Sequence, residues 1–160
     1  MAIKVGDRIP SVPLKVVTPA GTKDVKADEY FAGKKVVLFA VPGAFTPTCS
    51  AQHLPGYIDQ ADAIRKKGVD EIACLSVNDA FVMGAWAKDR GAGSNVAMLA
   101  DGNGEFTRAV GLELDGSKFG MGSRSQRYAL VVDDGIVRHI AVEQPGKFEV
   151  SKAEAILGAL

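Results

Sequence analysis

One cysteine, Cys49, stands in a sequence context that exposes a reactive thiol. The apolar run VVLFAV at residues 36–41 ends at a proline-punctuated loop, after which the chain resumes as a helix with Cys49 in its first turn. The hydroxyl of Thr46 or Thr48 can cap that helix. A thiol near the unpaired N–H groups and the positive dipole end of a helix has a lowered pKa. The pattern predicts nucleophilic or redox chemistry at Cys49.

The second cysteine, Cys74, has two interpretations that the sequence leaves open. It lies in a strand predicted over residues 71–77, with Ile72 and Ser76 on its own face. Burial as a small apolar side chain would explain it. It could also resolve an oxidised Cys49 by forming a disulfide, for which the two Cα atoms must come within about 7 Å. If Cys74 is buried in a strand, local unfolding must come first.

His53 stands four residues after Cys49, a spacing at which two side chains share one face of a helix. The pair could form the Cys–His dyad of a cysteine hydrolase, in which the imidazole activates the thiol. No convincing third residue that would orient the imidazole is evident. We therefore place a hydrolase below redox chemistry. A second alternative is a non-catalytic redox-signalling module that is oxidised slowly at Cys49.

The N-terminal half is predicted to contain a hairpin at 14–25, a short helix at 27–31, the strand at 36–41, a helix at 50–67, a strand at 71–77 and a helix at 78–90. Pro55 removes a backbone donor, which predicts a kink or a break about one turn after Cys49. Asn78 is expected to cap the last of these helices, whose inner face would use Val82, Ala85 and Trp86.

The C-terminal half is predicted to contain a strand at 96–99, a short helix at 105–110, a long loop at 111–126, a hairpin formed by 127–132 and 136–142, and a terminal helix. The loop at 111–126 is rich in glycine and has little periodicity. Loops of this length are often functional, so we expect it to line the site. Ser151 and Glu154 have the spacing of a capping box that opens the terminal helix.

This order of elements indicates an α/β fold. Strands that alternate with helices, followed by a closing hairpin and helix, describe a mixed sheet with helices on both faces. The strand at 36–41 has no polar alternation, as expected for a strand buried on both faces. A thioredoxin-like mixed sheet flanked by helices, with an N-terminal β-hairpin extension, fits best. Residues 1–160 are expected to form a single domain.

Composition argues against several classes of function. The 19 basic and 19 acidic side chains cancel, so no net field would attract nucleic acid or an anionic membrane. The first residues lack the apolar core of a signal peptide, and no apolar run approaches the roughly 18 residues that span a bilayer. A soluble, cytoplasmic protein is expected. Two histidines and two scattered cysteines give no zinc spacing, and without a phosphate-binding loop we expect neither a metal nor a nucleotide cofactor.

The run PGAFTPTCS at residues 42–50, followed by HLPG at 53–56, resembles the active-site signature of the type II (peroxiredoxin 5-like) peroxiredoxins. Further similarity covers nearly the whole chain, at residues 68–72, 76–79, 81–83 and 100–102 and at Arg127. The resemblance implies a thioredoxin fold and the reduction of hydrogen peroxide and alkyl hydroperoxides at Cys49, through a sulfenic acid.

The resemblance also implies roles for Pro42, Thr46 and Arg127 around the sulfur, and each role has a chemical reason. Arg127 can hold the thiolate and a peroxide oxygen with its fork of donors, and the Thr46 hydroxyl can donate to one and accept from the peroxide proton. Pro42 would shield the site and offers no competing N–H. Arg124 is a candidate for a supporting role.

Four large aromatic residues are expected to lie mostly in the core: Phe45, Phe81, Trp86 and Phe119. Phe45 and Phe119 could instead form an apolar collar around the site or a dimer contact, and the resemblance favours a homodimer through a face near the active site.

Recycling of the oxidised enzyme stays open in the sequence. The resemblance places a second cysteine at the position of Cys74 in plant-type members and leaves its role as a resolver undecided. The C-terminal resolving cysteine of vertebrate peroxiredoxin 5 is absent, because residues 75–160 contain no cysteine. Glutathione with glutaredoxin, or thioredoxin, would then reduce the Cys49 sulfenic acid.

Overall fold

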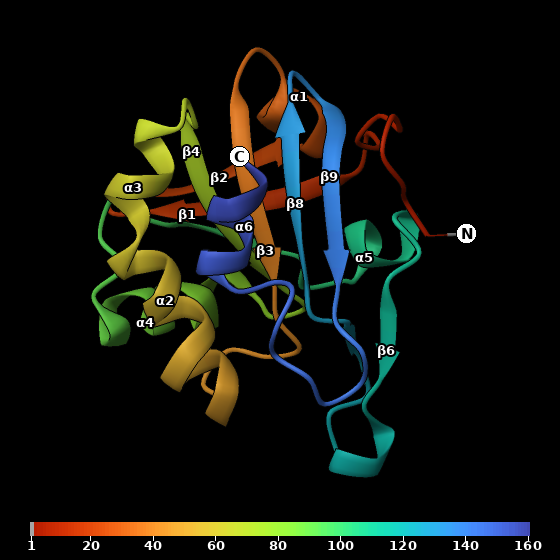
Figure 1. The fold of residues 1–160 in the computed structure, drawn as a ribbon. Coiled ribbons are helices and arrows are strands. Elements are labelled where there is room, and N and C mark those ends of the chain that lie inside the picture. The colour runs from red at the N-terminus through yellow and green to blue at the C-terminus, as the bar shows by residue number, and fades with distance from the viewer. Residues whose placement is uncertain (1) are drawn as a thin grey trace.

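The structure, a computed structural model that describes residues 2–160, is built on a seven-stranded mixed sheet with strand order β2-β1-β5-β4-β3-β8-β9 (Figure 1). Its strands are β1 (Pro13–Thr18), β2 (Gly21–Lys26), β3 (Lys35–Ala40), β4 (Glu71–Ser76), β5 (Ala97–Ala100), β8 (Tyr128–Asp133) and β9 (Ile136–Val142). β3, β4 and β5 run parallel, and hairpins extend both edges. The thioredoxin-like mixed sheet with an N-terminal hairpin extension is confirmed.

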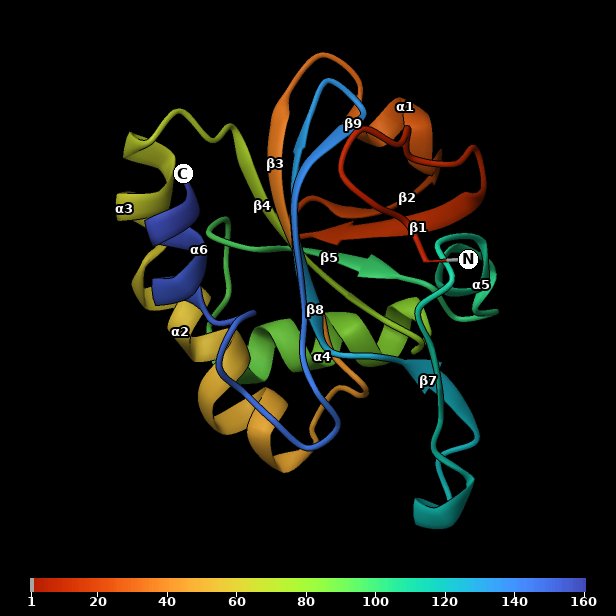
Figure 2. The ribbon, with the colours of Figure 1, turned by 45° about the vertical axis from the view of Figure 1, so that its right-hand side comes forward.

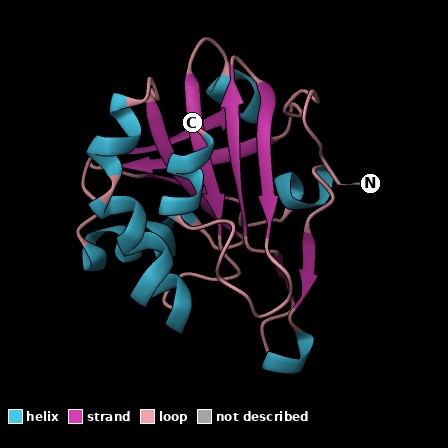
Figure 3. Cartoon of the chain, viewed as in Figure 1, coloured by secondary structure: helices cyan, strands magenta, loops and turns pink. Residues whose placement is uncertain are grey.

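Helices cover both faces of the sheet, as Figures 2 and 3 show. One face carries α1 (Ala27–Phe31) and α5 (Glu105–Ala109), and the other carries α2 (Leu54–Asp59), α3 (Ala61–Lys66), α4 (Ala80–Arg90) and α6 (Ala153–Ala159). The buried apolar side chains accordingly form two clusters, one on each face. None of the described helices is long and apolar enough to cross a bilayer.

The sheet separates the two clusters, and its strand β3, next to the central strand β4, leads to the cysteine loop. Because side chains alternate along a strand, Leu38 and Ala40 face the cluster beneath α1 and α5, while Phe39 and the following Val41 face the other. Cys49 belongs to that second cluster. The chain therefore leaves β3 on the side where α2, α3, α4 and α6 pack.

The helix after Cys49 departs from regular α geometry. Residues Cys49–His53 form a π turn, in which the Leu54 N–H donates to the carbonyl of Cys49, five residues back. A wider turn accommodates Pro55, which has no N–H to donate. The predicted irregularity one turn after Cys49 is thus present as a π turn, whereas the chain breaks its helix later, at Gln60, between α2 and α3.

The predicted cap of α4 was displaced by one residue. The Asp79 carboxylate, not Asn78, accepts from the Val82 N–H at 2.8 Å. The Asn78 side-chain oxygen is already engaged, because it accepts from the Ala44 N–H at 3.0 Å. Asn78 thereby ties the loop before Cys49 to the end of β4.

The buried face of α4 also differs from the prediction. Met83 and Trp86, one helical turn apart, enter the cluster that contains Cys49, whereas Val82 is half-buried and Ala85 is exposed. Only Trp86 of the predicted three points inward.

The capping box expected at the terminal helix is not formed. α6 follows Lys152, and no side-chain hydrogen bond caps it. The N–H and the hydroxyl of Ser151 both donate instead to Oε2 of Glu143, at 2.8 and 2.7 Å. Glu143, which is distant in the sequence, therefore accepts the Ser151 N–H that Glu154 would accept in a capping box.

Residues 111–126 form a short two-stranded arm and not an irregular loop. β6 (Glu113–Asp115) pairs with β7 (Ser123–Ser125), and a 3-10 turn at Ser117–Phe119 lies near the tip. The arm extends away from the main sheet (Figure 2). Three-residue strands leave too few alternating positions for a periodicity to show in the sequence.

Candidate active site

Cys49 is fully buried at the start of the π turn. Neither threonine caps this turn: helical backbone begins at Pro47, and the Thr46 hydroxyl points back to donate to the carbonyl of Gly43 at 2.6 Å. The Thr46 carbonyl accepts from the Ser50 N–H at 2.9 Å. The expected side-chain cap is therefore wrong, and the Thr46 hydroxyl has its proton committed to Gly43.

The loop before Cys49 is packed closely against the arm. A Cβ on Gly43 would lie 3.1 Å from the Met121 side chain and 3.1 Å from Thr46, so glycine permits this approach. Arg124 reinforces it, donating to the carbonyls of Met121 at 2.9 Å and Val77 at 3.3 Å. The predicted supporting residue Arg124 thus joins the arm to the segment after β4.

Arg127 reaches the sulfur from the start of β8. Its Nη2 donates to Sγ of Cys49 at 3.2 Å, and its Nη1 lies 2.8 Å from Nδ1 of His53. The two segments meet because β8 pairs with β3, placing Tyr128 opposite Ala40 just before the cysteine loop. The guanidinium sets a permanent positive charge and a fixed donor beside the thiol.

His53 is held as a neutral imidazole of defined tautomer. Because arginine can only donate, Nδ1 must accept from Arg127, so Nε2 carries the hydrogen and donates to the carbonyl of Ser151 at 3.1 Å. Burial, helped by the charge of Arg127, lowers the pKa of His53 to about 3. The lone pair that a hydrolase would need to activate Cys49 is already engaged, which argues against the dyad.

Behind His53 lies a buried carboxylate that the sequence did not bring forward. Oε2 of Glu143 accepts from the N–H and hydroxyl of Ser151 and from the N–H of Glu149, at 2.8, 2.7 and 2.7 Å. Burial opposes its ionisation, but the hydrogen bonds from Ser151 and Glu149 outweigh that effect and hold the pKa of Glu143 below its usual value. The same Ser151 carbonyl that His53 contacts also accepts from the Tyr57 hydroxyl at 2.6 Å.

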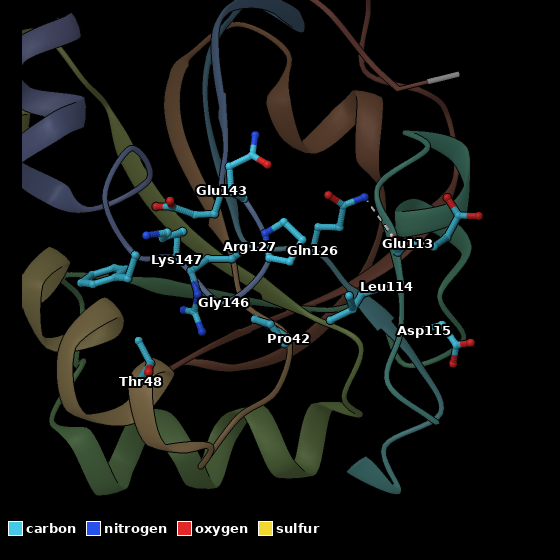
Figure 4. Close-up of a pocket in the computed structure, with 13 residues that line it drawn as sticks. Pro42, Thr48, Glu113, Leu114, Asp115, Gln126, Arg127, Glu143, Gly146 and Lys147 are labelled. Atoms are coloured by element: carbon cyan, nitrogen blue, oxygen red, sulfur yellow. Dashed lines mark hydrogen bonds between the residues drawn. The ribbon is translucent and has the colours of Figure 1, made fainter. Parts of the chain in front are cut away.

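A cavity of about 420 Å³ opens beside this cluster (Figure 4). Pro42, Thr48 and Arg127 line it, together with the 143–148 segment and residues from the base of the arm. Gln126 donates to the Glu113 carbonyl at 3.2 Å across that base. The expectation that residues 111–126 line the site is met by Glu113, Leu114, Asp115 and Gln126.

Cys74 lies in the central strand β4, fully buried, with Phe39 and Met98 opposite it on the neighbouring strands. Burial, and secondarily the nearby Cys49, raises the pKa of its thiol. Both cysteines are free thiols. The structure thus gives Cys74 the surroundings of a core residue, from which a bond to Cys49 would require local unfolding.

Comparison with known proteins identifies the family. The Redoxin family profile matches residues 4–157. Peroxiredoxin-2E, chloroplastic, of Arabidopsis thaliana is 51% identical over 163 residues, covering 99% of this chain and 70% of that protein. Reduced Prx3 from Vibrio vulnificus, solved in complex with H2O2, matches with TM-score 0.93 and 55% identity over 98% of both chains. Peroxiredoxin 5 from Alvinella pompejana matches with TM-score 0.85 and 41% identity over 98% of this chain and 97% of that chain.

The same family is indicated by the Cys49 motif, by the mixed thioredoxin-like sheet and by these relatives. The chain belongs to the type II (peroxiredoxin 5-like) peroxiredoxins and is therefore a thiol-dependent peroxidase with an antioxidant role.

Proposed function

We propose that this peroxidase reduces hydrogen peroxide and alkyl hydroperoxides at Cys49, with Arg127, Thr46 and Pro42 completing the site, and that an external thiol recycles it. The observation that carries the proposal is the 3.2 Å contact between Sγ of the buried Cys49 and Nη2 of Arg127, a residue that lines the cavity. This contact stabilises negative charge on the sulfur and leaves further guanidinium N–H groups for a peroxide oxygen.

The first chemical step moves two electrons from sulfur to the peroxide. The Cys49 thiolate attacks the terminal oxygen of ROOH, an S–O bond forms and the O–O bond breaks. The products are a sulfenic acid on Cys49 and RO⁻, which takes up a proton to leave as ROH. Arg127 acts on the charge that develops on the leaving oxygen, where a fixed donor is most effective.

Thr46 is proposed to accept the peroxide hydrogen. Its own proton is donated to the Gly43 carbonyl at 2.6 Å, so its oxygen can act only as an acceptor toward a peroxide. A neutral peroxide ROOH supplies such a donor, and its O–H bond to Thr46 would orient the O–O axis toward the sulfur. The sequence predicts that this hydroxyl both donates to the thiolate or peroxide oxygen and accepts the peroxide hydrogen; because it donates to Gly43, we propose only the accepting role.

The cavity supports a substrate range that includes organic peroxides. Pro42, Leu114 and Phe148 contribute apolar side chains to its wall, and such surfaces favour an alkyl group near the reacting oxygens. The relative from Vibrio vulnificus was solved with H2O2, which supports hydrogen peroxide as a substrate here.

We propose that glutathione with glutaredoxin, or thioredoxin, reduces the sulfenic acid, because Cys74 is fully buried in a central strand. One external thiol reacts with the sulfenic acid to form a mixed disulfide with Cys49 and release water. A second thiol then attacks the sulfur of the first, which forms a disulfide between the two external thiols and restores the Cys49 thiol.

Replacement of Cys74 by serine is expected to leave turnover with the external thiol unchanged, because the residue is core packing and not a resolver. Mass spectrometry of peroxide-treated wild type and Cys74→Ser, with turnover compared for glutaredoxin–glutathione and thioredoxin, provides the measurement. Cys74→Ala is the matched variant, since it buries no unpaired hydroxyl. A Cys49–Cys74 disulfide in the wild type, lost together with turnover in both variants, would contradict external recycling.

We further propose that the peroxidase is a homodimer. Phe45, Phe81 and Phe119 are 50%, 90% and 81% exposed, contrary to the expectation that they lie in the core, whereas Trp86 is buried as expected. The loop after β3, α4 and the tip of the arm lie toward the same end of the molecule (Figure 1). Large exposed apolar side chains mark an interaction surface, and a second copy of the chain would cover them.

The Phe81→Glu variant is expected to shift the protein from dimer to monomer, because it places a charge in an apolar contact. Sedimentation velocity over a concentration series measures this shift. Val5→Glu is the matched control, since Val5 is also an exposed apolar side chain, at 56%, and its substitution should leave the dimer intact. A monomeric wild type, or a Phe81→Glu protein that stays dimeric, would overturn the proposed interface.

A further inference from the structure

Arg127 has a long, flexible side chain, and its conformation decides where the donor Nη2 lies relative to Sγ of Cys49. Its charged group makes two side-chain hydrogen bonds within the described residues: Nη2 to Sγ of Cys49, and Nη1 to Nδ1 of His53. A thiol sulfur is a weak acceptor, so the 3.2 Å contact with Cys49 fixes the donor only loosely, while the imidazole nitrogen accepts at 2.8 Å. The second contact therefore defines where the planar fork lies and, through that plane, where Nη2 points.

We propose that His53 is a positioning residue, a neutral imidazole that accepts from Nη1 of Arg127 and so fixes Nη2 against the sulfur of Cys49. This inference rests on the proposed role of Arg127 in peroxide reduction. It gives His53 a function that is distinct from both a Cys–His dyad and simple core packing.

A neutral acceptor suits this position electrostatically. A carboxylate beside Nη1 would offset much of the guanidinium charge, and less of that charge would remain for the thiolate and the leaving oxygen. The imidazole supplies a lone pair without a compensating negative charge. Its protonation is opposed by complete burial and by the adjacent Arg127, which together place its pKa at about 3.

The imidazole is itself held on three sides. Its Nε2–H donates to the Ser151 carbonyl at 3.1 Å, and the ring lies between Phe39 and Phe148, with centroid distances of 4.9 and 5.0 Å. Glu143 fixes Ser151 in turn, through the bonds to its N–H and hydroxyl. Glu143 and Phe148, which line the cavity, thus also help to set the orientation of His53.

Two substitutions separate the two nitrogens of His53. In His53→Asn, Oδ1 takes the place of Nδ1 and can still accept from Arg127, whereas the side chain is too short to reach Ser151. In His53→Gln, the terminal amide can replace Nε2 at Ser151 but leaves no acceptor at the Nδ1 position. We expect Cys49 oxidation to slow about 10- to 100-fold in His53→Gln, the effect of misplacing a catalytic group, and only about threefold in His53→Asn.

The rate of Cys49 oxidation is measured by stopped flow at a pH high enough to ionise the thiol. The probe is the fluorescence of Trp86, the single tryptophan. Its Nε1 donates to the hydroxyl of Ser50, the residue after Cys49, at 2.9 Å. Tyr57→Phe is the matched control, because it deletes another buried hydrogen bond to the Ser151 carbonyl without touching Arg127. That variant should unfold at lower urea but oxidise Cys49 at the wild-type rate.

A double-mutant cycle with Arg127→Ala completes the test. If His53 acts through Arg127, His53→Gln should cause little further loss in the Arg127→Ala background. Equal losses in both backgrounds, or equal losses in His53→Asn and His53→Gln, would overturn the positioning role. A normal rate in Arg127→Ala would instead refute the proposed role of Arg127 itself, so the two failures are distinguishable.

The free energy of unfolding at acidic pH gives a measurement that is independent of catalysis. The unfolded chain protonates its histidine below about pH 6.5, while the folded chain keeps His53 neutral, so stability falls as pH falls from 6.5 toward 3. The unfolding constant of the wild type should therefore rise about 15-fold between pH 6.5 and 5 relative to that of His53→Asn. Identical pH profiles for the two proteins would show that His53 is not held as a neutral acceptor.

Discussion

Replacement of Cys49 by serine is expected to abolish peroxide reduction completely. The hydroxyl of serine does not ionise near neutral pH, and its oxygen cannot be oxidised to the equivalent of a sulfenic acid. The substitution is nearly isosteric in a buried position, and Nη2 of Arg127 can donate to the new oxygen as it does to Sγ. The fold should therefore survive while the chemistry is lost. Peroxide consumption with an external thiol reductant measures the effect.

Two controls separate this outcome from damage to the fold. Urea unfolding of Cys49→Ser should follow the wild-type curve closely, and Cys74→Ala should keep its peroxide consumption. Cys49→Ser should also lose the peroxide-dependent change in Trp86 fluorescence, because no oxidation occurs beside Ser50. Peroxidase activity that persists in Cys49→Ser would show that another group performs the reaction. It would also remove the basis for every role assigned around this sulfur.

The sequence could predict the elements because their signals are local. The apolar strand before Cys49, the hairpins at both edges and the helices between strands each show in a short window. The family motif added the residues nearest the sulfur. Arg127 was found only through that resemblance, since an arginine at the start of a strand is by itself ordinary.

What the sequence could not predict are contacts made across long separations. The pairing of Arg127 with His53 joins residues 74 positions apart, and no spacing rule connects them. Two predicted caps failed for the same reason. The side-chain oxygen of Asn78 accepts from the cysteine loop, and Ser151 donates to Glu143, so both side chains serve tertiary contacts that compete with the local cap.

These same failures have a functional meaning. Asn78 fixes the loop that precedes Cys49, and Ser151 fixes His53. Local capping rules describe what a side chain does when nothing else requires it. Asp79 caps α4 in place of Asn78, and α6 has no side-chain cap, so both predicted capping residues are used for contacts around Cys49 and His53.

Arg127→Ala is expected to slow Cys49 oxidation by about 10²- to 10³-fold at pH 7, the usual effect of removing one donor that stabilises a developing charge, which corresponds to about 2.7–4 kcal/mol. Ionisation alone cannot account for so large a loss. A thiol of ordinary pKa, about 8.5, is about 3% thiolate at pH 7, so complete ionisation can raise a rate by roughly 30-fold at most. The remainder must come from the transition state.

The pH dependence of the variant separates the two contributions. At pH 9.5 a thiol of ordinary pKa is about nine-tenths ionised, so any loss that came only from ionisation would disappear. We expect most of the loss in Arg127→Ala to remain at that pH, measured by stopped flow with the thiolate absorbance followed in parallel. Full recovery at pH 9.5 would contradict a transition-state role and reduce Arg127 to a counter-ion for the sulfur.

Arg127→Lys tests whether charge alone is sufficient. Lysine retains the positive charge but presents it on a single nitrogen, whereas the native fork spans Sγ of Cys49 and Nδ1 of His53 with two nitrogens. The ammonium can serve one partner well or both poorly. We therefore expect a rate between those of the wild type and Arg127→Ala. A wild-type rate in Arg127→Lys would show that charge governs the reaction and that the geometry of the fork does not.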